Sequence, residues 1–298
     1  MRNKKDQWLM IIKLTLFVVF VSFNSCAVDE EQTKWSNNGV TLSVSYHNIP
    51  NHQSFVIYND TILFIDLNGN CFVYSTKEER VNNQIALKYN GFNIPHANVA
   101  CFGVKSDNSS IFPLLYVSQW DGEGGCLVYD FNKNYSGELE AVWKQTIIPK
   151  NLPEGIIGKN LGDWVVDANN EYLYSIKYHN YSSELSNGNC VHIAKFKLPS
   201  LLDGNYIELS ENDVLDNFDI PFIPIMQDKL IKDELMYIAA GGTYNTQKII
   251  IVDLRNKTIL NQVDLVFFGG EPEGFFLKDG EMFLSYYSHS ELYSLSYK

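Results

Sequence analysis

The sequence has few basic residues and no stretch of helical periodicity. Lys and Arg number 23 against 35 Asp and Glu, so the formal net charge is −12. A surface this acidic repels nucleic acid and anionic lipid headgroups, and we expect neither as a partner. Tyr and Phe are abundant instead, at 18 residues each. This composition favours β-structure.

The sequence also lacks the short motifs of common catalytic and metal sites. It contains no nucleophile elbow, no phosphate-binding loop and no zinc-binding helix motif. Its five cysteines include no CxxC pair and no Cys/His spacing that suggests zinc. Motifs therefore leave open whether the protein is an enzyme.

No apolar run is long enough to span a bilayer as a helix. Leu14–Phe23 is too short for that, and it follows the basic residues Arg2, Lys4 and Lys5. This order is typical of a secretory signal, which we predict over residues 1–25. Its removal leaves a net charge of −15, since it holds four basic residues and one acidic residue.

The residues that follow, Phe23-Asn24-Ser25-Cys26, resemble the lipobox of bacterial lipoproteins. That resemblance implies that Cys26 is lipidated and that residues 26–37 form a tether, whose acidic start resembles an export tag to the outer face of the outer membrane. A single lipid anchor tethers a protein without spanning the bilayer. The alternative is an ordinary cleaved signal peptide with an incidental cysteine.

A three-strand pattern recurs through residues 38–298, which we predict to form one domain. The third strand of each unit begins with a small or apolar residue after a turn, and these positions recur every 43 to 64 residues. They are Cys71, Cys126, Cys190, Ile249 and Leu292. Such repeats are typical of β-propeller blades.

The repeats predict an all-β propeller of five blades. The fifth unit lacks an outer strand, and Val40–Tyr46 can supply it, so pairing of the two termini closes the ring and removes an open sheet edge. Six blades are the alternative, with extra strands in Leu202–Phe218. A two-sheet sandwich is a further alternative. Because the blades hold the cysteines apart, we expect them to act as small hydrophobes rather than to pair.

Three regions resemble the broad NHL/TolB-like group of propellers, here as uncharacterised surface lipoproteins: His96–Gly103, Pro113–Ser118 with Cys126–Tyr129, and Gly269–Gly274. The resemblance implies the propeller fold. The group includes enzymes, binding proteins and scaffolds, so fold alone does not select a function.

Two sets of links open on one face of a propeller, around its axial channel. The links before the inner strands carry His52, Gln53, His96, Asn98, Asp163, Trp164, Glu271 and Glu273. The links between second and third strands add Trp120, Asp121, His179, Tyr244 and Tyr287. Except for Gln53, we predict all of these as ligand-binding residues.

Aromatic rings beside short polar side chains suit a sugar, whose ring packs on aromatics while its hydroxyls form hydrogen bonds. A glycan is therefore the favoured ligand. The enzyme hypothesis places Ca²⁺ or another metal among the histidines and carboxylates, for hydrolysis or lyase chemistry on a saccharide or ester. In a variant of it, Asp163 and Glu273 form a glycosidase pair. No confident metal ligand emerges.

The segment Glu271-Pro272-Glu273-Gly274 resembles phytase-like and lactonase-like propellers, in which a Glu at the channel mouth binds metal. Its structural interpretation is a turn into the last inner strand, with Pro272 fixing φ and Gly274 allowing close approach. Phe222–Met226 in the fourth unit offers no matching ligand. A third hypothesis is a docking scaffold for a surface protein. In each case we expect a monomer.

Overall fold

The computed structural model describes residues 34–37, 40–94, 96–105, 110–120, 125–150, 162–179, 190–221, 223, 225–243, 246–265 and 269–297. Trp35–Lys298 forms one compact unit, and the fold described below is that of this unit. Within the described residues, no helix is long and apolar enough to cross a membrane.

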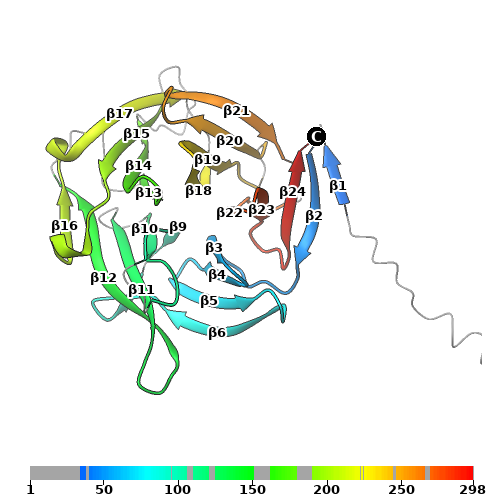
Figure 1. Cartoon of the computed structure of the whole chain (residues 1–298). Helices are drawn as coiled ribbons and strands as arrows, with labels where there is room; N and C mark the ends of the chain where they lie inside the picture. Colours follow the sequence, from blue (N-terminus) through cyan, green and yellow to red (C-terminus); the bar gives the residue numbers. More distant parts are fainter. Residues whose placement is uncertain are drawn as a thin grey trace, which may run out of the picture. The chain divides into compact units, whose positions relative to one another are not determined.

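Five sheets of mainly antiparallel strands are arranged in a ring, as Figure 1 shows, which confirms the predicted five-bladed propeller. From the inner to the outer strand, the first blade contains β3 (Ser54–Tyr58), β4 (Thr61–Ile65), β5 (Asn70–Ser75) and β6 (Arg80–Ala86). The second contains β9 (Ala97–Phe102), β10 (Leu115–Gln119), β11 (Cys126–Lys133) and β12 (Leu139–Pro149). The third contains β13 (Gly162–Asp167), β14 (Tyr172–His179), β15 (Cys190–Lys197) and β17 (Val214–Pro221).

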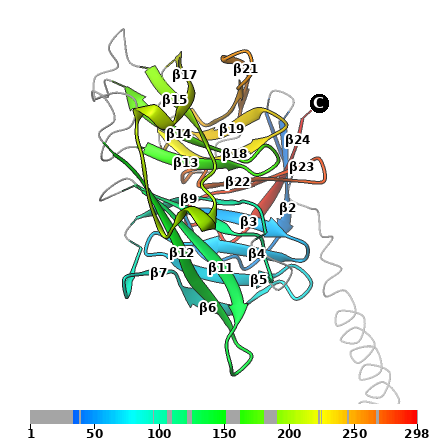
Figure 2. The same cartoon turned by 60° about the vertical axis from the view of Figure 1, so that its left-hand side comes forward.

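The fourth blade contains β18 (Met226–Lys232), β19 (Leu235–Ala240), β20 (Lys248–Asp253) and β21 (Thr258–Asp264). The fifth contains β22 (Gly274–Lys278), β23 (Glu281–Ser285), β24 (Leu292–Tyr297), β2 (Val40–Tyr46) and β1 (Lys34–Asn37). A short hairpin, β7 (Lys88–Tyr89) and β8 (Phe92–Asn93), follows the first blade. Figure 2 shows the same blades after a 60° turn.

The ring closes through the two ends of the chain, as the sequence predicts. Strand β2 pairs antiparallel with β24, from Val40 opposite Tyr297 to Tyr46 opposite Leu292. Leu42 is buried in the core that this pairing creates. The edge of the last sheet is thereby covered by the first strands of the propeller.

Residues 202–218 form no sixth blade. They contain β16 (Tyr206–Leu209), which pairs parallel with β12 and extends the second blade, and most of β17, which is the outer strand of the third. Two short 3₁₀ helices, Leu201–Asp203 and Glu211–Asp213, flank β16.

The sequence Asn-Gly-Asn-Cys occurs twice, at residues 68–71 and 187–190, and it has a local explanation in the first blade. The Asp66 carboxylate accepts hydrogen bonds from the backbone N–H groups of Asn68 and Asn70, at 2.9 and 2.8 Å. Gly69, with φ of 72°, completes the turn, and a Cβ there would lie 3.0 Å from that of Ile94. Cys71 then pairs opposite Ile65 at the start of the third strand. The cysteine therefore occupies a small apolar position after a tight turn.

The cysteine prediction is confirmed for the four that the structure describes. Cys71, Cys101 and Cys126 are buried, Cys190 is half-buried, and none of them is in a disulfide. Burial raises the pKa of the Cys101 thiol to about 12, which suits a role in packing rather than reactivity.

The five inner strands are held together at the axis by buried polar groups. Asp228 on β18 accepts hydrogen bonds from the Ser54 hydroxyl on β3 and the Phe275 N–H on β22, at 2.9 and 3.0 Å. Lys229, the next residue, forms a buried ion pair with Asp163 on β13. Asn98 on β9 donates to the same Asp163 at 2.8 Å. One network thus reaches every blade and fixes the register of the hub, because each buried polar group needs its partner.

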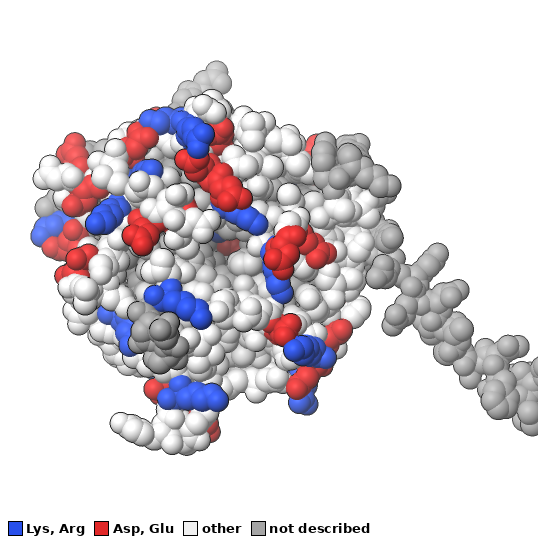
Figure 3. Space-filling view, in the orientation of Figure 1, with Lys and Arg blue, Asp and Glu red and all other residues white. Residues whose placement is uncertain are grey.

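Figure 3 shows acidic and basic side chains intermixed over the face in view. Several are paired, such as Lys257 with Asp216 at 2.6 Å. Such exposed pairs contribute little to stability, so the hub and the interfaces between blades hold the fold together.

Candidate ligand-binding site

A pocket of about 240 Å³ opens at the mouth of the hub. Four of its residues stand directly before the inner strands of four blades, at equivalent positions: Gln53, His96, Ile225 and Glu273. The pocket is completed by Asn98, Trp120, Tyr178, Met226, Gln227 and Glu271. Ligand pockets for drug-sized molecules occupy roughly 300–1,000 Å³. This pocket therefore suits a smaller molecule, or one end of a longer one.

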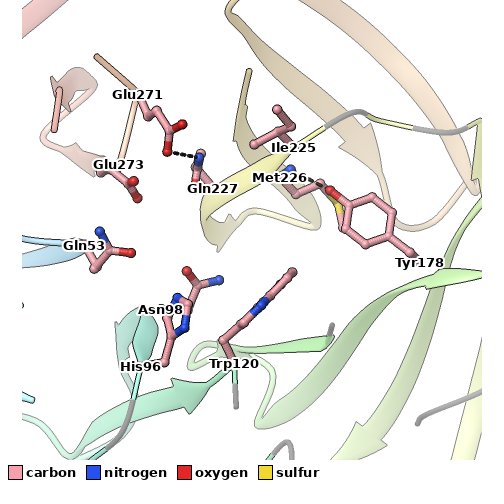
Figure 4. A pocket seen from close by; sticks show the side chains of 10 residues that line it. All are labelled: Gln53, His96, Asn98, Trp120, Tyr178, Ile225, Met226, Gln227, Glu271 and Glu273. Carbon is pink, nitrogen blue, oxygen red and sulfur yellow. Dashed lines mark hydrogen bonds between the residues drawn. The ribbon is translucent and has the colours of Figure 1, made fainter. Parts of the chain in front are cut away.

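One wall of the pocket is aromatic. Figure 4 shows Trp120 and Tyr178 on the side opposite Glu271 and Glu273. The Tyr178 hydroxyl accepts a hydrogen bond of 2.6 Å from the Met226 N–H, and the backbone N–H of Trp120 donates to the backbone carbonyl oxygen of His96 at 3.0 Å. The Tyr178 side chain is thus held by the backbone of the fourth blade, and the backbone of Trp120 is fixed beside His96.

The opposite wall carries two carboxyl groups from one short segment. Glu271 accepts hydrogen bonds from the Gln227 amide at 3.0 Å and from the Thr243 hydroxyl at 3.4 Å. Gly274, which follows Glu273, allows the close approach that the sequence suggests: a Cβ there would lie 2.4 Å from both Phe55 and Ser285. The segment is thus a turn into β22 that also presents two acids to the pocket.

Glu273 is the least satisfied acid among the described residues of the pocket. Its side chain is only 4% exposed, and its Oε2 atom has no hydrogen-bond partner among the residues that the structure describes. Burial raises the pKa of this carboxyl well above its ordinary value, and the negative charge of Glu271 raises it further, against a hydrogen bond from Gln53. A buried polar atom without a partner costs free energy, which makes this carboxyl group in the lining of the pocket a candidate contact for a ligand.

Two residues of the pocket have unusual backbones. His96 and Ile225 have φ angles of 46° and 48°, in the left-handed region that a β-branched residue such as Ile225 rarely adopts. Each precedes an inner strand and lines the pocket. Such strain clusters at functional sites, where the surrounding structure compensates for it.

The structure brings together five of the predicted ligand-binding residues. They are His96, Asn98, Trp120, Glu271 and Glu273. Asp121 and Tyr244, together with Cys26, lie outside the described residues, as does the side chain of His179. Tyr287 is described and 43% exposed, but it does not line the pocket.

Three predicted residues lie beneath the surface instead. Trp164 is 1% exposed and packs against Phe196 in the core between the second and third blades, with ring centroids 5.9 Å apart. His52 is buried, with Nε2 2.6 Å from the Ser285 hydroxyl and Nδ1 2.8 Å from the Pro50 carbonyl oxygen. Burial lowers the pKa of His52 to about 4. Its ring therefore has a structural role.

Asp163 is the third, and its position argues against the glycosidase pair. Its carboxylate is inaccessible and already contacts Lys229, Asn98 and Ser118, the last at 3.3 Å. A catalytic carboxylate must reach the substrate directly or through a water. Asp163 does not line the pocket, so it has no such access.

Sequence reasoning missed the contribution of the fourth blade. Phe222–Met226 provides no polar ligand, but the next residue, Gln227, lines the pocket, as do Ile225 and Met226 by packing. The signal was the polar triplet Gln227-Asp228-Lys229 inside an otherwise apolar inner strand. Tyr178, on the second strand of the third blade, carried no sequence signal that sets it apart from the other tyrosines.

Among the residues that the structure describes, no group of three or more His, Cys, Asp or Glu side chains is positioned to hold a metal ion. The predicted metal site combines histidines with carboxylates. Its two histidines have different surroundings, since His52 is buried against Ser285 and His96 lines the pocket.

No protein-family model matches the chain, and no curated protein matches it in sequence. Among solved structures, the chain is similar to the crystal structure of Myxococcus xanthus glutaminyl cyclase, with a TM-score of 0.51, 10% identity, and coverage of 86% of this chain and 95% of that one. A glucose dehydrogenase matches with a TM-score of 0.47 and 11% identity over 85% of this chain and 98% of that one. The likeness to the glutaminyl cyclase supports the β-propeller fold, and the predicted resemblance holds at that level alone.

Proposed function

We propose that the protein binds one sugar unit of an extracellular glycan in the pocket at the mouth of its hub. The observation that carries this proposal is the pairing of an aromatic wall, Trp120 and Tyr178, with a polar wall of amides and carboxyl groups. The C–H face of a sugar ring packs on aromatic rings, while its hydroxyls both donate and accept hydrogen bonds.

The size of the pocket supports a short ligand. A cavity of about 240 Å³ encloses a single ring more readily than an oligosaccharide. Its side chains offer donors and acceptors within that space, including Gln53, Asn98 and Gln227. The remainder of a glycan would extend away from the hub.

Among the described residues that line the pocket, no carboxyl group faces Glu271 and Glu273 from the other side, so binding is favoured over glycoside hydrolysis. Glu271 and Glu273 come from one segment, and Asp163 is sealed beneath the surface by Lys229. Two-carboxylate glycosidases need acids that flank the scissile bond. The proposal also retains export and lipidation at Cys26, which would place the pocket at the cell exterior.

A thermal-shift screen tests the proposal. The protein without residues 1–25 is heated with a panel of monosaccharides and short oligosaccharides, with and without EDTA. A ligand that binds the folded state raises the melting temperature by mass action. A rise with a sugar that EDTA leaves unchanged supports the proposal. A rise that requires a divalent metal would favour the metal-assisted enzyme, and no response to any sugar would favour the docking scaffold.

A further inference from the structure

The pocket presents several hydrogen-bond acceptors to a ligand. Asn98 donates one N–H of its amide to Asp163, and Gln227 donates one to Glu271, at 2.8 and 3.0 Å. The carbonyl oxygen of each amide is left for a ligand, together with the second N–H of its NH₂ group. Together with the unpartnered Oε2 of Glu273, these oxygens call for a ligand group with several donors.

The pocket also has acidic charge without a matching base. None of the described residues that line the pocket is Lys or Arg, whereas two of them, Glu271 and Glu273, are acidic. Lys229 lies nearby, but its ammonium group is fully buried and held by Asp163 and by the carbonyl oxygen of Gln227. Lys229, two residues after the lining residue Gln227, therefore neutralises charge inside the hub and not in the pocket.

We propose that the sugar is an amino sugar, and that its ammonium group lies between the carboxyl groups of Glu271 and Glu273. An ammonium group supplies three donors and a positive charge, which are the two properties that this wall lacks. The sugar ring would then lie against Trp120, whose face also attracts a nearby cation. This inference rests on the proposed function, and it names the ligand class for the same pocket.

Proton linkage follows from the neighbours of Glu273. The charged and titratable groups around it are Glu271 on its own segment, Asp228 on β18 and His96 before β9, with the Lys229–Asp163 pair below. Two adjacent carboxyl groups in a buried site tend to hold a proton between them. An ammonium group that takes this place displaces the proton, so binding releases a proton and strengthens as pH rises.

Isothermal titration calorimetry with glucosamine, N-acetylglucosamine and glucose tests the inference. Titrations over about pH 5 to 7 keep the amine charged, since the pKa of an amine of this type is about 8. Paired buffers of different ionisation enthalpy report the protons exchanged. We expect glucosamine to bind at least about tenfold more tightly than the two neutral sugars, which corresponds to about 1.4 kcal/mol. We also expect it to release protons on binding.

Glu273→Gln should abolish both the preference for glucosamine and the proton release. Glu281→Gln, which alters an exposed acid on β23 of the same blade, is the matched control and should leave both unchanged. If Glu273→Gln fails to fold, the selectivity and proton count of the wild-type protein still decide the question.

Equal affinity for glucosamine and glucose would overturn the inference and leave the proposed function standing. Binding of no sugar at all would overturn the proposed function itself. Glycinamide, a small amine without a sugar ring, is a further arm. If it binds and no sugar does, the ammonium site exists but the amino sugar is wrong.

Discussion

The ammonium group of Lys229 lies 2.5 Å from a carboxylate oxygen of Asp163, and neither side chain is accessible to solvent. The two residues belong to different blades, β18 and β13. The pair therefore links the inner strands of the third and fourth blades, which are neighbours in the ring. Its own net contribution to stability is small, because burying two charges is costly, but loss of one partner leaves an uncompensated charge.

Lys229→Met should accordingly destabilise the fold by about 3–5 kcal/mol. The substitution leaves the Asp163 carboxylate buried without a cationic partner, because its remaining partners, Asn98 and Ser118, are neutral. Urea denaturation followed by fluorescence measures the effect. Replacing both partners, with Asp163→Leu and Lys229→Met, should cost less than Lys229→Met alone, because no buried charge remains. A double variant as unstable as the sum of the single variants would contradict this account.

Stability should fall as pH rises from about 6.5 to 8.5. Burial raises the pKa of Asp228 from 3.8 to about 8, despite hydrogen bonds from Phe275, Lys229 and Ser54. The folded state then binds a proton that the unfolded state has released, so the contribution of this group is lost as pH passes the folded pKa. Glu273 acts in the same direction, because its pKa is also raised.

His52 does not interfere with this measurement. Its pKa is lowered to about 4, so its opposite effect is confined to pH below about 6.5, where the unfolded residue titrates. Urea denaturation at intervals of pH gives the slope. Asp228→Asn should flatten it, whereas Glu281→Gln should not. A wild-type stability that is constant or increases over this window would show that these acids are ionised in the fold.

Among the described cysteines, Cys190 should react first with iodoacetamide. It is half-buried, whereas Cys71, Cys101 and Cys126 are buried. Burial raises the thiol pKa of all four, so the greater access of Cys190 decides the order. Thiolate formation and access together set the rate of alkylation. Peptide mapping by mass spectrometry identifies the modified residue. Modification of Cys126 before Cys190 under native conditions would contradict the packing described here.

The fold could be predicted because each blade repeats the same local signals. Turns such as Asp66–Asn70 and apolar strands such as Thr61–Ile65 are encoded by short stretches, and the unpaired fifth unit pointed to Val40–Tyr46. Residues 202–218 were harder to assign, because a strand that extends one blade has the same sequence pattern as a strand that starts another.

The site could be predicted only in part. How far a side chain lies below the channel mouth depends on the register of its inner strand against the neighbouring strands, which the sequence does not reveal. His96 and Glu273 precede their strands and reach the pocket. Asn98 and Gln227, each the second residue of its strand, also line it, whereas Asp163, the second residue of β13, lies inside the hub. Successive residues of a strand point to opposite faces, so a shift of one position moves a side chain from the channel mouth into the core. Trp164, one residue further, packs between blades for the same reason.

Sugar binding in the pocket is tested most directly by comparing Trp120→Ala with Tyr287→Ala. Calorimetric titrations would use the sugar that gives the largest thermal shift. Trp120 forms the aromatic wall of the pocket, whereas Tyr287 is an exposed aromatic near the same face that does not line it. Loss of stacking is worth about 0.5–1.5 kcal/mol, so Trp120→Ala should weaken binding by up to about tenfold while Tyr287→Ala retains wild-type affinity. Equal affinity in Trp120→Ala and the wild-type protein would contradict sugar binding in this pocket.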